Sequence, residues 1–100
     1  MTSERPQGSP GIELGASTVA DLQRRLRKVE GQVRGVQQML TDGRDCREIV
    51  TQIAAANKAL GQVGFLLVSA GLTWCLEDPS RSSAAGYDTA DVQKMFLKLA

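Results

Sequence analysis

Apolar residues recur every three or four positions along two long stretches of the chain. In the first stretch they are Val19, Leu22, Leu26, Val29, Val33, Val36 and Leu40, and in the second Ile49, Ile53, Ala56, Leu60, Val63, Leu67, Ala70 and Trp74. This spacing is that of the buried seam of an antiparallel helical bundle or coiled coil. The pattern therefore predicts two long helices, the second running without interruption from Cys46 to Cys75.

Local signals predict where these helices begin and end. Ser17 or Thr18 is the expected N-cap of the first helix. Residues 1–16, which are rich in glycine and proline, are expected to form a flexible arm. Residues 41–45 are expected to form the turn between the two helices, with Gly43 available for a positive φ.

The chain after the second helix predicts a linker and one short helix. Pro79 is expected to stop the long helix, and residues 80–86 are typical of a linker. Asp88 or Thr89 then caps a third helix. Its apolar residues are Val92, Met95, Phe96 and Leu99. The predicted fold class is all-α, with a three-helix subunit occupying residues 17–100.

A stripe of small residues runs along the second helix beside its apolar seam. It comprises Asn57, Gly61, Gly64, Val68, Gly71 and Cys75. Because glycine has no side chain, another helix can approach the backbone closely along this stripe.

The two cysteines lie far apart on one predicted helix. From 46 to 75 is 29 positions, which corresponds to about 44 Å along a continuous helix and returns to within roughly 20° of the same face. Within one chain the thiols cannot meet. If the same helix of a second chain packs antiparallel, Cys46 of one subunit lies near Cys75 of the partner subunit, and the two-fold axis creates two identical thiol pairs. Two unrelated buried cysteines are the alternative, since free cysteine is a common small core residue.

Cys46 and Cys75 have opposite electrostatic settings. Cys46 lies in the first turn of the long helix, where the helix dipole and nearby arginines favour a thiolate. Its charged neighbours are Arg44 and Arg47, which favour the thiolate, and Asp45 and Glu48, which oppose it. Cys75 lies at the helix C-terminus, beside Trp74 and shortly before Glu77 and Asp78. We therefore expect Cys46 to be the attacking thiol and Cys75 the resolving one.

Length and composition narrow the class of protein. One hundred residues allow one small domain, which is expected to complete its core by oligomerising. The absence of histidine removes the commonest general base and metal ligand and argues against a hydrolytic enzyme. Two cysteines without a signal peptide indicate a cytoplasmic protein with reduced thiols. The most apolar segment, residues 63–70, is too short to span a membrane.

Basic residues gather on the first helix, although the net charge of the whole chain is only +1. A helical projection places them opposite the apolar stripe, with Gly31 and Gly35 among them. They are Arg24, Arg27, Lys28 and Arg34, with Arg25 at the border of the stripe. A bare backbone flanked by arginines suits the approach of a phosphate backbone. A solvated charged face is the alternative.

Several motifs in this order resemble the copper-sensing operon repressor (CsoR) family. They are RRLRKVEGQVRGVQQML at residues 24–40, TQIAA at residues 51–55, and the spacing of Cys46 and Cys75. The resemblance covers residues 18–77. It implies small all-helical subunits that form an antiparallel dimer and then a dimer of dimers. Such assemblies bind operator DNA without a helix-turn-helix, and inducers release the DNA.

The resemblance to the copper sensors is incomplete at the inducer site. In those proteins the first cysteine joins a cysteine and a histidine of the partner subunit, and the histidine lies four residues before that cysteine. Gly71 occupies this position here, and Asp45 replaces the tyrosine that commonly precedes the first cysteine. Copper(I) accepts thiolates, so a two-sulfur copper(I) site of Cys46 and Cys75 is an alternative.

The cysteine pair alone resembles the persulfide-sensing branch, the CsoR-like sulfurtransferase repressors (CstR). There a sulfane sulfur donor modifies one thiol, and attack by the other yields intersubunit di-, tri- or tetrasulfide links. The resemblance implies a repressor, not an enzyme, that needs no cofactor and responds to reactive sulfur species. A general thiol-oxidation sensor and a small sulfur carrier are further alternatives.

The same resemblance assigns DNA contacts to five basic residues. They are Arg25 and Lys28, with Arg24, Arg34 and Lys58 contributing to the same face. Most of these contacts are expected to be to phosphate, which predicts a steep salt dependence. Whether Asp91 in the third helix couples the thiol site to the DNA surface is left open by the sequence.

Overall fold

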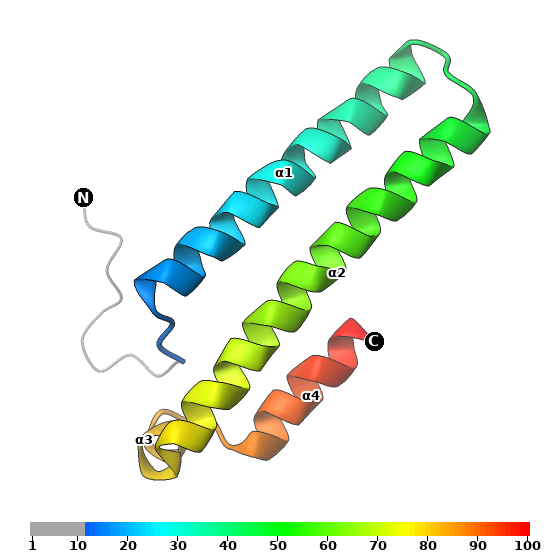
Figure 1. Cartoon of the computed structure of the whole chain (residues 1–100). Coiled ribbons are helices and arrows are strands. Elements are labelled where there is room, and N and C mark those ends of the chain that lie inside the picture. Colours follow the sequence, from blue (N-terminus) through cyan, green and yellow to red (C-terminus); the bar gives the residue numbers. More distant parts are fainter. Residues whose placement is uncertain (1–11) are drawn as a thin grey trace.

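The computed structural model describes residues 12–100, and this part of the chain forms helices only (Figure 1). The helices are α1 (Ala16–Thr41), α2 (Cys46–Glu77), α3 (Pro79–Ala84) and α4 (Thr89–Leu99). The all-α prediction is confirmed, but the described residues form four helices instead of three. Residues 1–11, most of the predicted flexible arm, lie outside the described part.

Helices α1 and α2 form a long antiparallel hairpin, and α4 packs against the C-terminal half of α2 (Figure 1). The hairpin turns at Gly43, which adopts a φ of +68°. The Asp45 side chain caps α2 by accepting a hydrogen bond of 2.9 Å from the backbone N–H of Arg47. The predicted turn and the predicted uninterrupted helix between the two cysteines are both confirmed.

Two predicted boundaries were wrong. Helix α1 begins at Ala16 with Gly15 as its N-cap, so neither Ser17 nor Thr18 caps it. The segment predicted as a linker begins with α3, because Pro79 occupies the first helical position and the Asp78 side chain accepts from the backbone N–H of Arg81 at 3.1 Å. A proline at this position has no N–H to leave unpaired, and its fixed φ suits the first turn.

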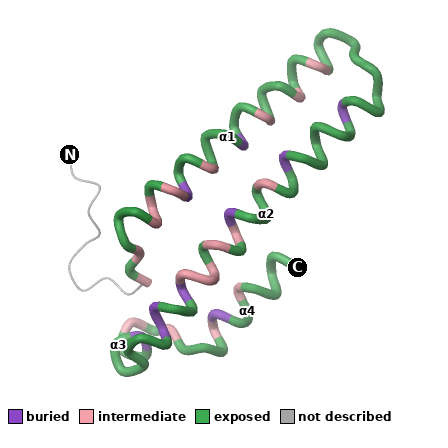
Figure 2. Tube along the Cα trace, viewed as in Figure 1, coloured by how far each residue is buried: buried purple, intermediate pink, exposed green. Residues whose placement is uncertain are grey.

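Only part of each predicted seam is buried within the subunit (Figure 2). The buried apolar residues of the α1–α2 hairpin are Leu22, Val29, Ile49, Ala56 and Val63. Trp74, Cys75 and Val92 form a second buried cluster, where α4 meets α2. Exposed apolar residues of the two seams include Leu26, Val33, Leu40, Ile53, Leu60 and Leu67.

The subunit is elongated, with extents of 54 × 35 × 18 Å and a radius of gyration of 17.4 Å. A compact chain of this length has a radius of gyration of about 13 Å. The elongated shape and the exposed apolar seam residues indicate that a single subunit leaves apolar surface which a second chain could bury.

Helix α2 is the one described helix that could cross a membrane by length and composition, with a mean hydropathy of 1.6 in its most apolar window. The core helix of a soluble bundle meets the same criterion. This qualifies the expectation drawn from residues 63–70, because the apolar window is longer than that segment.

Candidate functional site

Cys46 lies at the tip of the hairpin, as the first residue of α2, and is exposed. The Asp45 side chain occupies the adjacent cap, and Arg44 forms an ion pair with Glu48. Arg44 was expected to favour the Cys46 thiolate, but its guanidinium is held by this carboxylate. The expectation that the Cys46 thiolate is favoured now depends on the helix N-terminus and on Arg47.

Cys75 lies at the opposite end of α2 and is buried, with an exposed fraction of 2%. Trp74 and Val92 are the other buried members of its cluster. The partly buried residues packed against this cluster are Ile12, Val68, Ala85, Tyr87 and Met95. Cys75 is therefore buried in a cluster to which α2, α4 and the segment that precedes α1 contribute.

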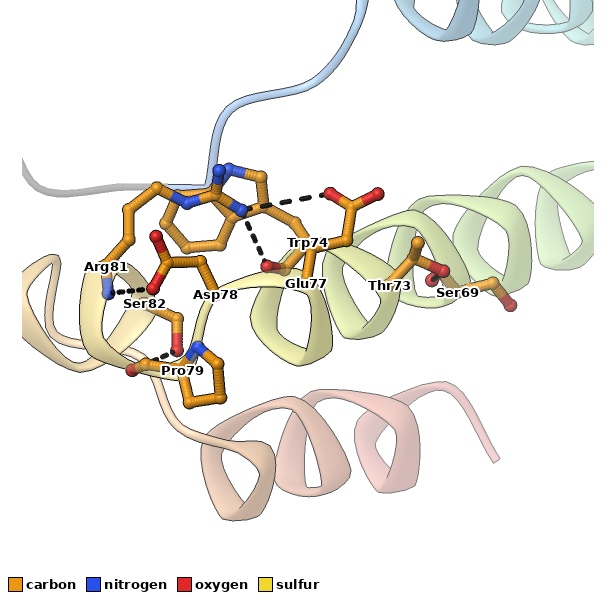
Figure 3. Close-up of polar contacts among 8 residues, drawn as sticks. All are labelled: Ser69, Thr73, Trp74, Glu77, Asp78, Pro79, Arg81 and Ser82. Atoms are coloured by element: carbon orange, nitrogen blue, oxygen red, sulfur yellow. Dashed lines mark hydrogen bonds and ion pairs between the residues drawn. The ribbon is translucent and has the colours of Figure 1, made fainter.

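The junction of α2 and α3 places a cation beside this cluster (Figure 3). The Arg81 guanidinium lies over the Trp74 ring, 4.4 Å from its centroid, and its Nη2 donates to the Trp74 carbonyl at 2.8 Å. The same group lies 3.9 Å from the Glu77 carboxylate. A cation at a helix C-terminus satisfies a free carbonyl and complements the helix dipole.

Arg81 was not among the residues predicted from the sequence to have a role. Its signal was present in the dipeptide Asp78–Pro79, an N-cap followed by a proline at the first helical position, which predicts a helix carrying Arg81. The sequence near Cys75, with Glu77 and Asp78, indicated an acidic environment. The structure adds a cation, Arg81, to that environment.

The stripe of small residues on α2 is used within the subunit. A Cβ atom added at Gly64 would lie 2.9 Å from the terminal methyl groups of Leu99 on α4. One added at Gly71 would lie 2.9 Å from Cδ1 of Ile12. Gly61 has no such neighbour within 4 Å. The predicted close approach of another helix thus occurs at Gly64, whereas at Gly71 the approaching segment is not helical.

The two thiols lie at opposite ends of one continuous helix of 32 residues, Cys46–Glu77. At 1.5 Å per residue they are about 44 Å apart along its axis. No group of three or more histidine, cysteine, aspartate or glutamate side chains able to hold a metal ion occurs among residues 12–100. A thiol pair, or a metal bound by two thiolates, therefore requires a second subunit.

The basic residues named for DNA binding fall on two sides of the subunit. Arg24, Lys28 and Arg34 are exposed on α1, and Arg25 is half-buried there. Lys58 is exposed on α2, two positions after the buried Ala56. Two positions correspond to about 200° around a helix, so Lys58 points away from the hairpin interface and is not continuous with the α1 residues within one subunit.

Two of the α1 arginines share one carboxylate. Asp21 accepts a hydrogen bond of 2.9 Å from Nε of Arg25 and also pairs with Arg24. The hydrogen bond from Arg25 is the main cause that lowers the pKa of Asp21 below its ordinary value of 3.8. The carboxylate is therefore ionised at neutral pH and partly neutralises the predicted DNA-binding face.

Asp91, left open as a coupling residue, has a local structural role. Its carboxylate accepts from the backbone N–H of Asp88 at 3.0 Å, while the Asp88 carboxylate accepts from the backbone N–H of Asp91 at 2.9 Å. This reciprocal arrangement is a capping box at the start of α4.

These features define a class of protein: an all-helical subunit with an unfinished apolar core and a predominantly basic helix. Comparison with known proteins gives the family. The family model described as "Metal-sensitive transcriptional repressor" matches residues 18–98. The chain belongs to this family and is a transcriptional repressor of the CsoR type, not an enzyme.

Individual relatives agree with this assignment. The chain is 40% identical over 68 residues to the copper-sensing transcriptional repressor RicR of Mycobacterium tuberculosis, covering 68% of each chain. It is 36% identical over 77 residues to the copper-sensing transcriptional repressor CsoR of Bacillus subtilis, covering 74% of this chain and 76% of that one. The crystal structure of the copper-sensing repressor CsoR with Cu(I) from Geobacillus thermodenitrificans is similar, with a TM-score of 0.75, 29% identity and coverage of 93% and 97%.

Proposed function

We propose that this cytoplasmic repressor binds operator DNA while its thiols are reduced and releases the DNA when a persulfide or polysulfide links Cys46 to Cys75 of the partner subunit. The observation that carries the proposal is the position of the two cysteines at opposite ends of one uninterrupted helix. Only a second chain can bring them together. The chain has no histidine that could complete a three-ligand copper site.

The proposed assembly is an antiparallel dimer that pairs again as a dimer of dimers. Exposed seam residues at seven-residue spacing support it, and they include Leu26 and Val33 on α1 and Ile53, Leu60 and Leu67 on α2. A groove of about 280 Å³ between α1 and α2 is lined mainly by apolar side chains of this kind. Ridges of a partner helix can fill such a groove.

The proposed thiol chemistry needs only the two cysteines and a sulfane sulfur donor such as HSSH. The Cys46 thiolate attacks one sulfur of the donor, the S–S bond breaks, and hydrosulfide leaves, which gives a Cys46 persulfide. The Cys75 thiolate of the partner subunit then attacks the Cys46 sulfur and displaces a second hydrosulfide. The two cysteines are oxidised to a disulfide while the donor is reduced to two hydrosulfide ions. Longer polysulfides leave additional sulfur in the link.

The proposed link lowers DNA affinity by changing how the two subunits pack. Covalent links at both ends of a pair of antiparallel helices shift their register or crossing angle, so the basic helices no longer match the spacing of the DNA. A coupling free energy of about 3 kcal/mol would weaken DNA binding about 150-fold.

A copper(I)-responsive repressor is the second candidate. Two relatives are named copper-sensing repressors, and thiolates are ligands that copper(I) prefers. The two cysteines alone fit only a two-thiolate site shared between subunits, because Gly71 stands where the copper sensors have a histidine and carries no donor atom.

Intact mass measured under denaturing, non-reducing conditions tests the inducer. Reduced protein is compared with protein exposed to an organic polysulfide and, separately, to hydrogen peroxide. We expect covalent dimers with sulfur-sized mass increments only after polysulfide treatment, and no such dimers from Cys46→Ser or Cys75→Ser. Unmodified monomers would exclude the sulfur inducer and direct attention to a copper(I) titration of the same thiols. Equal crosslinking by peroxide would indicate a general thiol-oxidation sensor.

The DNA-binding face is tested with duplexes selected from a random library by the reduced protein. Arg25→Ala is expected to weaken binding to all selected sequences. It should also reduce the slope of log affinity against log salt by about 1 for each phosphate that the variant no longer neutralises. Lys94→Ala on α4 is the matched control and should change both quantities less. Equal effects of the two variants would contradict the assignment of the face to α1.

A further inference from the structure

Met95 brings a thioether to the cluster that buries Cys75. It lies on α4, one turn after Val92, and packs against the buried side chains of Trp74, Cys75 and Val92. Residues three positions apart lie on the same face of a helix. Because Val92 is only 2% exposed, the face that it shares with Met95 is the one that packs against α2. Met95 is partly buried there.

Met95 also shares a groove with the position at which the copper sensors carry a histidine. Gly71 holds that position here, one helical turn before Cys75 and on the same face of α2. The groove has a volume of about 560 Å³, and both Gly71 and Met95 line it. The donor atom that α2 lacks at Gly71 is therefore matched by a sulfur donor on the neighbouring helix α4.

The methionine side chain suits copper(I) in two respects. Its thioether is a soft donor of the kind that copper(I) prefers, whereas zinc(II) is bound in proteins by cysteine, histidine and carboxylate ligands. The side chain is unbranched and has three rotatable bonds. Its sulfur can therefore turn from the packed cluster toward a bound ion without movement of the backbone.

We propose that Met95 is the third ligand of a copper(I) site whose other two ligands are Cys75 of the same subunit and Cys46 of the partner subunit. This inference rests on the pairing of the two cysteines across subunits and deepens the copper(I) candidate described above. The site contains sulfur donors only, two thiolates and one thioether. It selects copper(I) over zinc(II), because the thioether contributes to the binding of copper(I) alone.

The thioether takes no part in the proposed sulfur chemistry. Persulfide formation and disulfide exchange need a thiolate, and the sulfur of Met95 already carries two carbon atoms. Met95 therefore separates the two candidate inducers. Removal of its sulfur should impair copper(I) binding and leave the polysulfide crosslinks between Cys46 and Cys75 of the partner subunit unchanged.

The test compares Met95→Leu with the parent protein, because leucine has a similar volume and removes the sulfur. The copper(I) affinity of the reduced full-length protein is measured without oxygen, in competition with bathocuproine disulfonate. Loss of a group that only orients a metal ligand costs about 10- to 100-fold in affinity, so we expect Met95→Leu to weaken copper(I) binding about tenfold or more. Met39→Leu on α1 is the matched control and should bind copper(I) as the parent does.

Two further measurements distinguish a ligand from a packing residue. The affinity for zinc(II), which depends on the two thiolates, should be the same in Met95→Leu and in the parent. X-ray absorption of copper bound to selenomethionine-labelled protein should show a selenium neighbour in the parent and in Met39→Leu. Labelled Met95→Leu should lack this neighbour.

Three results would overturn the Met95 ligand. They are a labelled parent without a selenium neighbour, a parallel loss of copper(I) and zinc(II) affinity in Met95→Leu, and copper(I) binding that Cys46→Ser leaves unchanged. The second result would indicate that Met95 only fills the cluster. If polysulfide leaves the parent thiols unmodified while copper shows the selenium neighbour, the sulfur-sensing proposal fails and the Met95 site stands.

Discussion

Arg24 and Arg25, two of the basic residues proposed to contact DNA, share the carboxylate of Asp21. It holds Arg25 by a hydrogen bond of 2.9 Å and also pairs with Arg24. Both arginines are among the residues proposed to contact phosphate. In the proposed complex, phosphates therefore compete with an ion pair inside the same helix. The Asp21 carboxylate is ionised at neutral pH, since the hydrogen bond from Arg25 holds its pKa below the ordinary value of 3.8.

Replacing Asp21 with asparagine keeps the shape of the side chain and removes its charge. We expect Asp21→Asn to tighten DNA binding by about threefold or more at low salt and to steepen its salt dependence, because both arginines become available to phosphates. Fluorescence anisotropy titrations at several salt concentrations measure both effects. Glu48→Gln is the control, since Glu48 pairs with Arg44 at the hairpin tip. A loss of affinity in Asp21→Asn would instead show that the carboxylate holds the arginines in their binding geometry.

Among the elements, α4 depends on its capping box. The backbone N–H of Asp91 donates to the Asp88 carboxylate, and this hydrogen bond is the main cause that lowers the pKa of Asp88 below 3.8. A carboxyl whose pKa is lowered by folding stabilises the folded state above its unfolded pKa, and this stabilisation is lost as the pH falls through the folded pKa. The contribution of Asp88 is therefore complete above about pH 4 and is lost below it.

Trp74, the one tryptophan of the chain, lies where α4 packs on α2 and reports this loss. We expect its emission to shift to the red below about pH 4 as α4 detaches. Asn is also a good N-cap but carries no charge, so Asp88→Asn should remove part of the pH dependence while leaving α4 docked at neutral pH. Fluorescence recorded from neutral to strongly acidic pH measures the difference between the two proteins. Identical profiles would show that other carboxyl groups control the acid transition.

Helices marked by an apolar repeat over several turns were predictable from the sequence. Features that depend on one or two residues were not. The apolar repeats predicted α1 and α2 nearly at their observed bounds, because each repeat extends over several turns. Helix α3 was missed because Pro79 was taken as a helix stop, although a proline after an N-cap aspartate also begins a helix. The close approach of Ile12 to Gly71 brings together residues that are 59 positions apart in the sequence, and no local pattern in the chain indicates such a contact.

At the scale of the whole molecule, one subunit does not bury its own apolar surface. Thirteen large apolar side chains among the described residues are 39% exposed or more. The exposed seam residues recur every seven positions, as the buried seam residues do. The apolar repeat that builds the hairpin therefore also provides a second, exposed apolar face. This is the arrangement expected of a helix pair whose core is completed by another copy.

Leu60 lies near the middle of this face, with an exposed fraction of 49% in the subunit. In the proposed antiparallel dimer it is buried, and burying an unpaired lysine charge there costs several kcal/mol, on the order of the free energy of a small interface. We expect Leu60→Lys to shift the protein to monomers and to lower its melting temperature, measured by light scattering after gel filtration and by circular dichroism. Gln62→Lys adds the same charge to an exposed position of α2, about 200° away around the helix. It should leave the molar mass unchanged. A Leu60→Lys protein that keeps the parent's mass would place the interface elsewhere and would remove the geometric basis for pairing Cys46 with Cys75 of the partner subunit.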